Sequence, residues 1–343
     1  MHHSKTVLPA EWDQQSGIMM TWPHEDTDWK DMLDEVEKCF LTIALSVLKY
    51  EKLLIVCLSK TRIESLIPDE FKKNLRLIEI ETNDTWARDH GPITVMKDGK
   101  PCLMDFKFNG WGLKFAADKD NLISRQLFQK KYFGQKVMYE NNMGIVMEGG
   151  SIESDGEGTV LTTSECLLSP NRNGNLNRTQ IEDILKLKLG ADRILWLNHG
   201  YLSGDDTDSH TDTLARFCDV ETIAYVKCDN DKDEHYAELK LMEDEIKQLR
   251  TKDLKPYKLV PLPMADPVWH DNHRLPATYA NFLIINNAVL VPAYGTEKDK
   301  EVENIIRNVF PDREIIMVNC LPLIKQHGSL HCVTMQFPNG VID

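Results

Sequence analysis

The sequence has no long hydrophobic run and few basic residues for its size. None of its 343 residues belongs to an apolar stretch approaching the roughly 18 residues of a membrane span. The opening MHHSKTVLPAEW also lacks the apolar core of a secretory signal. Lysine and arginine number 40 against 54 acidic residues, which gives a net charge of -14. Because such a chain repels nucleic acid, we expect neither a nucleic-acid nor a membrane partner, whereas a small cationic ligand suits it.

Cysteine and histidine pairs at metal-binding spacing are missing as well. The eight cysteines are scattered, none forms a C-x-x-C pair, and a chain of this length needs no disulfide framework. No H-E-x-x-H or H-x-H set occurs. We therefore expect no metal, no cofactor and a reducing, cytoplasmic location. Four cysteines lie among apolar neighbours, as buried thiols do: Cys39, Cys57, Cys102 and Cys166.

A strand–turn–strand unit recurs along the chain. Hairpins are predicted where apolar or alternating runs flank turn residues, at Asp98-Gly99, Asp155-Gly156, near Asp219 and at Asn286-Asn287. Helical spacing covers 31–50, 177–190 and 298–310, and a last strand is expected over 331–337. About five units of hairpin plus helix fit the chain, which favours a closed α/β array over a Rossmann sheet. No linker divides the sequence, so a single domain over residues 1–343 is predicted.

Cys332 is the candidate nucleophile. It lies in KQHGSLHCVTMQF, where a glycine-containing loop enters an apolar strand and a thiol can face a site from a rigid backbone. Its chemistry would need a lowered pKa or a neighbouring cation, because the thiolate is the reactive form. One more buried cysteine is the alternative. On such a strand the adjacent His331 should point away from Cys332, and we expect no catalytic role for it.

A second candidate group surrounds His210. Four aspartates crowd it in GDDTDSHTD, and such a cluster is unfavourable unless it binds a cation, caps turns or faces solvent. A metal is one such cation, although the glycine and terminal glutamate of an EF-hand loop are absent. An organic cation is the other. At the start of a strand, His210 and Asp212 would face the same side because they are two residues apart.

Two further motifs pair a carboxylate with features that admit a ligand. In WARDHGP, Trp86 offers a flat apolar wall and Asp89 a carboxylate, which together suit a planar cation. In MEGGS, Glu148 precedes two glycines that permit close approach of a ligand or of backbone. The alternatives are a surface pair of Arg88 with Asp89 beside a packed tryptophan, and an ordinary strand-end turn.

Five motifs, in order, resemble the agmatine deiminase and bacterial peptidylarginine deiminase family: WARDHGP, MEGGS, GDDTDSHTD, NFLIIN and HGSLHC. The resemblance begins at LPAEWDQQSGIMMTWP and covers nearly the whole chain. It implies a pentein fold, an α/β propeller of five ββαβ-type modules with pseudo-fivefold symmetry and the active site at its centre. In one departure, many members read GGGNIHC where this chain reads QHGSLHC, so that only Gly328 of the glycine run remains and His327 is added.

The resemblance also implies roles by position. Cys332 matches the nucleophile, His210 the general acid and base, and Asp89 and Asp212 the two carboxylates that bind a guanidinium. In the implied reaction Cys332 attacks the guanidinium carbon, His210 protonates the departing ammonia, and water hydrolyses the S-amidino enzyme. Besides the two aspartates, the expected substrate-binding residues are Trp86, Trp111, Glu148 and Asn281.

The segment FKFNGWGLKFAADKDN bears on the choice of substrate. The peptidylarginine branch carries arginines here, whereas this chain has Trp111-Gly112, as in the agmatine branch, with Lys114 as the nearby cation. We therefore expect hydrolysis of agmatine to N-carbamoylputrescine and ammonia, a step in putrescine biosynthesis. The alternatives are deimination of arginine or peptidylarginine, a metal-dependent hydrolase, and a non-catalytic pentein binding protein. The sequence leaves a homo-oligomer open.

Overall fold

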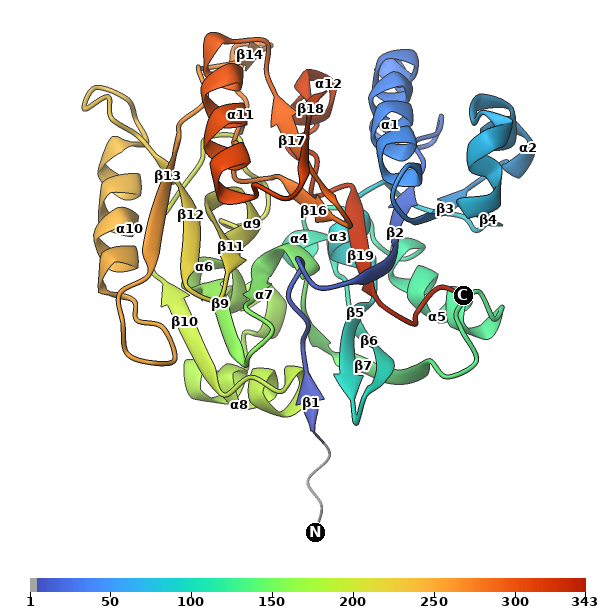
Figure 1. Ribbon diagram of the computed structural model, residues 1–343, viewed down its shortest axis with the longest axis horizontal. Helices are drawn as coiled ribbons and strands as arrows, with labels where there is room; N and C mark the ends of the chain where they lie inside the picture. Colours follow the sequence, from blue (N-terminus) through green and yellow to red (C-terminus); the bar gives the residue numbers. More distant parts are fainter. Residues whose placement is uncertain (1–4) are drawn as a thin grey trace.

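The computed structural model describes residues 5–343, whose strands form five sheets of three or four strands around a common centre (Figure 1). Each sheet contains an antiparallel pair followed by a parallel neighbour. The parallel neighbour is reached through a helix, because a parallel connection needs a crossover. The helices α1, α5, α8, α10 and α11, whose bounds follow, lie on the outside of the ring in Figure 1. The expected arrangement of five ββαβ-type modules is confirmed.

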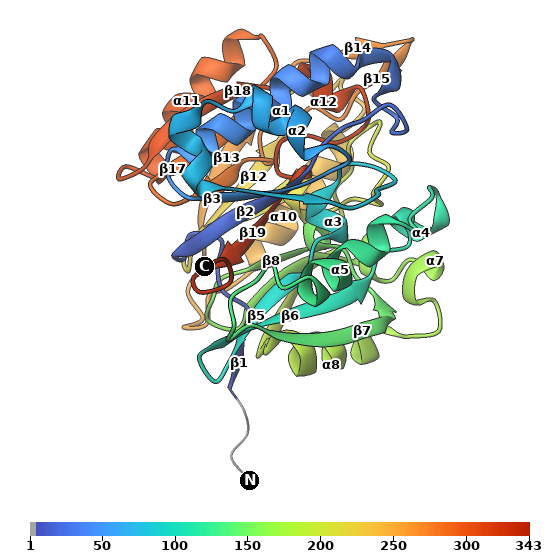
Figure 2. The same cartoon turned by 90° about the vertical axis from the view of Figure 1, so that its right-hand side faces the viewer.

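The first module joins the two ends of the chain. It contains β2 (Gln15–Thr21), α1 (Leu33–Leu48), β3 (Lys52–Cys57), α2 (Lys60–Leu66), β4 (Leu75–Glu79) and the C-terminal β19 (Thr334–Pro338). β19 pairs antiparallel with β2, so that Thr334 lies opposite Met20 and Phe337 opposite Gly17. Figure 2 shows the red β19 beside the blue β2. The last strand therefore closes the ring by completing the sheet that the first strands began.

The other four modules follow in chain order. The second contains β5 (Ile93–Lys97), β6 (Lys100–Lys107), α4 (Gly110–Leu113), α5 (Ile123–Gln129) and β7 (Met138–Val146), with β1 (Thr6–Val7) added beside β5. The third contains β8 (Ile152–Ser154), β9 (Thr159–Thr163), α6 (Ser164–Leu167), α7 (Pro170–Asn173), α8 (Arg178–Leu189) and β10 (Arg193–Leu197). The fourth contains β11 (Ala215–Asp219), β12 (Thr222–Lys227), α10 (Tyr236–Gln248) and β13 (Lys258–Pro263). The fifth contains β16 (Leu283–Ile285), β17 (Ala288–Ala293), α11 (Glu297–Val309) and β18 (Glu314–Asn319), and α12 (Leu321–Ile324) leads out of it.

Further short elements lie within the modules or connect one module to the next. They are the helical turns η1 (Lys30–Met32), η2 (Asp69–Asn74), α3 (Ala87–His90), η3 (Asp120–Leu122), η4 (Gly149–Ser151) and α9 (Thr211–Leu214), and a ribbon of β14 (Trp269–His270) and β15 (His273–Arg274). Among the described residues, no helix combines the length and the apolar character needed to cross a membrane.

Local sequence explains most of these boundaries. Asp98 and Gly99 have φ of 50° and 75°, which a two-residue hairpin turn requires, and Asn287 has φ of 60°. Helix α8 begins after a capping box between Asn177 and Gln180 and ends at Gly190, whose φ is 71°. The hairpin near Asp219 turns at 220–221 instead, because Asp219 itself pairs in β11. The expected strand over 331–337 is wrong at its start, since β19 begins at Thr334 and residues 330–333 form a turn.

Candidate active site

Each module sends a segment to the centre of the ring immediately before its first strand. Because the modules are related by rotation about one axis, equivalent strand ends meet there, as α3 and α9 do around the centre of Figure 1. The sequence candidates occupy these equivalent positions: Asp89 on α3 before β5, Glu148 before η4 and β8, His210 and Asp212 at α9 before β11, Asn281 before β16, and Cys332 before β19. Residues more than 240 apart in sequence thus belong to one site.

Cys332 lies in the turn before β19, with 5% of its surface exposed. Its backbone is held from two sides: Arg88 N–H donates to its carbonyl oxygen at 3.1 Å, and its own N–H donates to Asn281 Oδ1 at 3.4 Å. The thiol contacts the same Asn281 oxygen at 3.4 Å and Asp212 Oδ2 at 3.9 Å. Burial and the two nearby aspartates raise the pKa of Cys332 well above its ordinary value. The free site therefore holds a thiol that needs a cation to become a thiolate.

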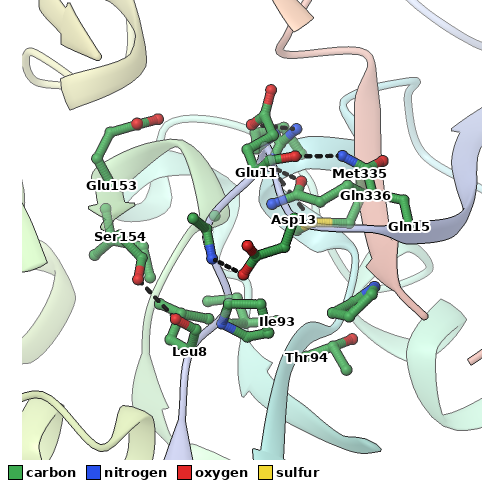
Figure 3. A pocket seen from close by; sticks show the side chains of 16 residues that line it. Leu8, Glu11, Asp13, Gln15, Ile93, Thr94, Glu153, Ser154, Met335 and Gln336 are labelled. Carbon is green, nitrogen blue, oxygen red and sulfur yellow. Dashed lines mark hydrogen bonds and ion pairs between the residues drawn. The ribbon is translucent and has the colours of Figure 1, made fainter. Parts of the chain in front are cut away.

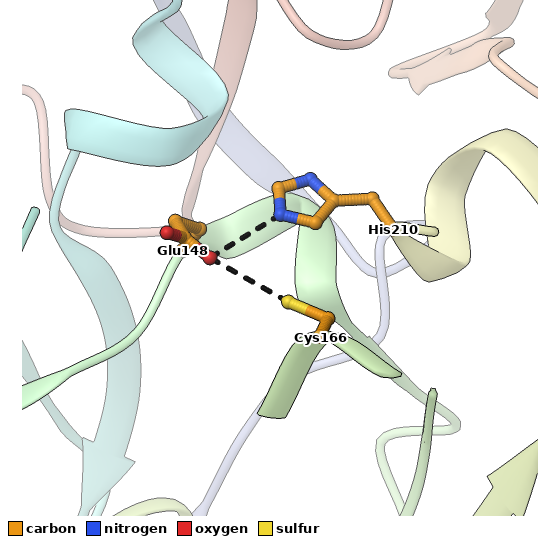
Figure 4. A group of neighbouring side chains, drawn as sticks. All are labelled: Glu148, Cys166 and His210. Atoms are coloured by element: carbon orange, nitrogen blue, oxygen red, sulfur yellow. Dashed lines mark hydrogen bonds and ion pairs between the residues drawn. The ribbon is translucent and has the colours of Figure 1, made fainter. Parts of the chain in front are cut away.

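His210 is fully buried between two carboxylates. Its Nε2 lies 3.3 Å from Glu148 Oε2, as Figure 4 shows, and its Nδ1 lies 3.6 Å from Asp89 Oδ1. Burial alone would lower the pKa of His210, but Asp89, Cys166 and Glu148 together raise it well above its ordinary value. These neighbours favour the protonated imidazole, which can act as an acid.

Asp89 and Asp212 are both buried, but their partners differ. Asp89 accepts hydrogen bonds from Gly150 N–H at 3.1 Å and Trp111 Nε1 at 2.9 Å, yet burial raises its pKa to about 6. Burial also favours the neutral form of Asp212, but a hydrogen bond of 2.7 Å with His331 Nδ1 outweighs this and lowers the pKa of Asp212. Asp212 is therefore the more firmly ionised of the two carboxylates.

Gly150 has no side chain, and His210, Asp89 and Asp212 surround the position that a Cβ atom would occupy. A Cβ atom there would come within 2.6 Å of His210 Nδ1, 3.0 Å of Asp89 Oδ1 and 3.2 Å of Asp212 Oδ1. Two of these atoms, His210 Nδ1 and Asp212 Oδ1, are buried without a hydrogen-bond partner among the described residues. Unsatisfied buried polar atoms are costly, and here they face one space. The arrangement suits a planar ligand that donates several N–H groups.

A cavity of about 140 Å³ reaches Cys332 and Asp89, whereas Gly150, His210 and Asp212 lie behind its lining. Cys332 and Asp89 form its buried end, and aromatic side chains form its walls, with Trp86 and Trp111 at a centroid distance of 6.4 Å. Gly328 lies against Trp86 so closely that a Cβ would overlap the indole ring. The more exposed end carries the carboxylates of Asp28, Asp84 and Asp206, and within the described chain no lysine or arginine lines the cavity.

The side chain of Lys114 is held at this entrance by hydrogen bonds to two aspartates. Its ammonium donates to Asp206 O at 2.7 Å and to Asp208 Oδ1 at 2.6 Å. The other oxygen of Asp208 accepts a hydrogen bond of 2.5 Å from Arg172 Nη1. The four aspartates of this cluster have different roles: Asp208 binds two cations, Asp205 caps the turn through Thr207 and Ser209, Asp206 lines the outer end of the cavity, and Asp212 lies beside Gly150 near His210.

Two groups of side chains have donor atoms close enough to hold a metal ion. These are Glu148 with Cys166 and His210 (Figure 4), and Glu11 with Glu153 and His331. An arginine already neutralises the carboxylates of each group. Arg172 Nε binds both oxygens of Glu148, at 2.8 and 3.0 Å, and Arg216 binds both Glu11 and Glu153. A divalent ion beside a buried guanidinium would be repelled, so these donors are better explained as hydrogen-bonding partners.

The structure places three sequence expectations differently. His210 and Asp212 do not share a strand face: His210 precedes the single turn of α9 and Asp212 lies within it, and they meet because this turn folds over Gly150. Glu148 and Asn281 do not line the cavity. Glu148 lies behind His210, and Asn281 supports Cys332 and donates to Asp212 O at 3.2 Å. Arg88 forms no surface pair with Asp89, since it is buried near Glu11.

Three contacts were not foreseen from the sequence. Arg172 orients Glu148, His331 bonds Asp212, and Glu11 bonds His331 at 2.7 Å. His331 lies 119 residues from Asp212 and 320 residues from Glu11, and Arg172 lies in another segment of the chain than Glu148. The residues next to Arg172, His331 and Glu11 do not identify these partners, so local sequence could not predict the contacts.

Comparisons with known proteins agree with this geometry. An agmatine deiminase of Stutzerimonas stutzeri is 33% identical over 96% of this chain and 95% of its own. A solved structure from Porphyromonas gingivalis, provisionally named an arginine deiminase, is 53% identical with a TM-score of 0.96, covering 99% of this chain and 100% of that one. An agmatine deiminase of C. jejuni with substrate bound is 37% identical with a TM-score of 0.92, covering 99% and 98%. The model of the Porphyromonas-type peptidyl-arginine deiminase family matches residues 7–338, and the chain therefore belongs to this family and has the pentein fold.

Proposed function

We propose that this protein is an agmatine deiminase, a hydrolase that converts agmatine and water to N-carbamoylputrescine and ammonia. The observation that carries the proposal is the charge along the cavity. Its inner end offers Asp89 and Cys332, and its outer end offers the carboxylates of three aspartates, with no lysine or arginine among the described residues that line it. Agmatine has a guanidinium at one end and an ammonium at the other, joined by an apolar chain that suits the tryptophan walls. Both ends of such a dication meet negative charge.

Free arginine fits this cavity less well. Its carboxylate would approach Asp28, Asp84 and Asp206, and like charges at close range are unfavourable. Lys114 could offset that charge only by leaving its bonds to Asp206 and Asp208. Burial raises the pKa of Asp84 to about 7, so a substrate ammonium nearby would also favour its ionised form. The cavity thus selects against a substrate carboxylate.

In the first half of the reaction the guanidinium lies between Asp89 and Asp212. Its charge lowers the pKa of Cys332, so that the thiol loses its proton to solvent when the cation binds, and the resulting thiolate attacks the central carbon to form a tetrahedral adduct. His210 protonates one terminal nitrogen, the carbon–nitrogen bond breaks, and ammonia leaves. An alkylthiouronium group then remains on Cys332. Glu148 holds the imidazole in place from behind.

In the second half water completes the hydrolysis. His210, now neutral, takes a proton from water, and the oxygen attacks the same carbon. The second adduct collapses by breaking the carbon–sulfur bond while its hydroxyl group loses a proton to solvent, which restores the Cys332 thiolate and releases a neutral ureido product. Every proton and electron pair in this scheme is supplied by the thiol, the imidazole, water and the substrate. We propose a cytoplasmic location and a role in putrescine biosynthesis for this activity.

Ammonia release from three substrates tests the proposal: agmatine, arginine and an arginine peptide blocked at both ends. The expected result is turnover of agmatine with a much higher kcat/KM than either of the others, abolished in Cys332→Ala. The P. gingivalis structure bears the name of an arginine deiminase, so the assay with arginine decides between agmatine deiminase and arginine deiminase activity. Preferential turnover of arginine or of the peptide would overturn the assignment to agmatine. Full activity in Cys332→Ala would overturn the mechanism.

A further inference from the structure

His331, the residue before the nucleophile, is clamped between two carboxylates. Its Nδ1 lies 2.7 Å from Asp212 Oδ2 and its Nε2 lies 2.7 Å from Glu11 Oε2, all of them buried. Carboxylate oxygens only accept hydrogen bonds, so both ring nitrogens must donate, and the ring is an imidazolium. Its backbone N–H donates to Asn281 Oδ1 at 2.8 Å. The ring therefore has one orientation available to it.

The far side of His331 is fixed by a buried ion network. Glu11 accepts a hydrogen bond of 2.9 Å from Arg216 Nη2 and lies 3.8 Å from Arg88 Nη2, while Arg216 also contacts Glu153. With His331 and Asp212 included, three positive and three negative groups balance. A buried network of this kind is favourable only when each charge has a partner, so removing one partner leaves a costly buried charge.

A second cavity, of about 50 Å³, lies behind this network (Figure 3). Glu11 and Glu153 line it, together with Arg88 and Gly149, whose chain neighbours Asp89 and Gly150 face the active site. Adjacent residues of one segment, Arg88 and Asp89, therefore line the second cavity and the active-site cavity respectively. Because open space adjoins Glu11, its position depends on ionic bonds rather than on packing from that side.

The clamp decides which atom of Asp212 remains free. His331 occupies Oδ2, whereas Oδ1 has no hydrogen-bond partner among the described residues and faces the space beside Gly150. Cys332 Sγ lies 3.9 Å from the occupied oxygen. If the carboxylate turned, Oδ1 would leave the space where the guanidinium binds.

We propose that His331 is a positioning residue: it locks the Asp212 carboxylate through Nδ1, so that Oδ1 is presented to the guanidinium, while Glu11 holds the imidazolium from behind. The hydrogen bond to Asp212 positions the carboxylate that binds the substrate. The hydrogen bond to Glu11 fixes the orientation of the imidazole ring. This inference deepens the proposed function and rests on it for the choice of substrate. The sequence led us to expect His331 on a strand, pointing away from Cys332 and without a catalytic role, whereas it lies in the turn before β19 and contacts Asp212.

Two substitutions of matched size separate the two bonds. In His331→Asn the amide nitrogen can take the place of Nδ1 and keep the bond to Asp212. In His331→Gln it can take the place of Nε2 and keep only the bond to Glu11. We expect kcat/KM for agmatine to fall by about 100-fold in His331→Gln and by less than about tenfold in His331→Asn, the range seen when groups that orient a site residue are lost. The dissociation constant of agmatine, measured by calorimetry in the Cys332→Ala background, should rise in the same order.

Thermal unfolding of both variants supplies the structural control, since each loses one buried bond. Equal kcat/KM in the two variants, or a larger loss in His331→Asn, would overturn the proposal whatever their melting temperatures. A failure of the proposed function looks different, because the wild type would then not deiminate agmatine. In that event kcat/KM of both variants is measured with the substrate that the wild type does turn over, either arginine or the blocked peptide. The loss must again be larger in His331→Gln than in His331→Asn.

Discussion

Asp89 sets the acid limit of the reaction. Its pKa is raised to about 6 by burial, and only the ionised form can pair with a guanidinium. We therefore expect kcat/KM for agmatine to decline as the pH falls through about 6. Trp111→Phe removes an N–H that bonds the ionised form, so it should raise this pKa and move the decline to higher pH. Trp196→Phe, whose N–H bonds Glu182 away from the site, is the control. If the decline of kcat/KM at low pH stays at the same pH in Trp111→Phe, the assignment of that decline to Asp89 is contradicted.

Glu148 sets the alkaline limit through His210. A nearby carboxylate favours the imidazolium, so Glu148→Gln should lower the pKa of His210. Because His210 must be protonated to release ammonia, the alkaline decline of kcat/KM should move to lower pH. A shift of about one unit reduces activity about tenfold above both pKa values.

The matched control for this change is Glu157→Gln, an exposed glutamate in the turn between β8 and β9. Glu148→Gln also leaves Arg172 beside a neutral amide, and the melting temperature should drop as well. A lower melting temperature with an unchanged alkaline limb would show that Glu148 acts on stability alone.

At the scale of elements, the turn that carries Trp111 is the most constrained part of the site. Gly110, Trp111, Gly112 and Leu113 all have positive φ, at 66°, 54°, 82° and 70°. A residue with a Cβ atom is strained in this region, and four in succession are exceptional. The turn brings the Trp111 N–H to Asp89 and is tied to the third module, since Asn109 Nδ2 donates to Asn171 O at 2.9 Å.

Alanine at Gly110 should therefore disturb the site, whereas alanine at Gly99 should not. Both glycines have positive φ, so each substitution costs about 1 kcal/mol in backbone strain. Only at Gly110 would the new Cβ overlap the carbonyl oxygen of Phe115; at Gly99 it meets open space. We expect Gly110→Ala to raise the KM for agmatine about tenfold or more by displacing Trp111, with Gly99→Ala close to wild type. Similar KM values in the two variants would show that the turn does not position the substrate.

The sequence predicts elements best where local residues determine them. The DG and NN turns located three hairpins correctly, and the Asn177 cap and Gly190 bounded α8. The short turns around the centre were missed, because α9 and the turn before β19 depend on contacts with other modules rather than on their own periodicity. The proposed catalytic set comes from the order of the motifs along the chain. The contacts of His331 with Asp212 and Glu11 were not predicted, because these partners lie 119 and 320 residues away from it in the sequence.

For the whole molecule, ring closure by β19 is the decisive long-range contact. Phe337 on β19 is fully buried, with its ring 5.4 Å from that of Phe133 in the second module. Phe337→Ala should lower the free energy of unfolding by about 3–5 kcal/mol. Leu187→Ala, on the exposed face of α8, should change it by about 0.5 kcal/mol or less. Denaturant midpoints measure both changes.

The same experiment tests the prediction of one domain over residues 1–343. If the ring unfolds as a unit, loss of far-ultraviolet dichroism and loss of deiminase activity should coincide, and Phe337→Ala should move them together. Two separated transitions would contradict a single cooperative domain.

The covalent intermediate is the central claim, because it unites the nucleophile, the bound guanidinium and the departing ammonia in one species. Mass spectrometry of enzyme quenched in acid during turnover of agmatine tests it directly. We predict a mass increase equal to agmatine minus one ammonia, located by peptide mapping on Cys332 and absent from Cys332→Ala. Turnover with no adduct on the wild-type enzyme, or an adduct on another of the eight cysteines, would contradict the mechanism.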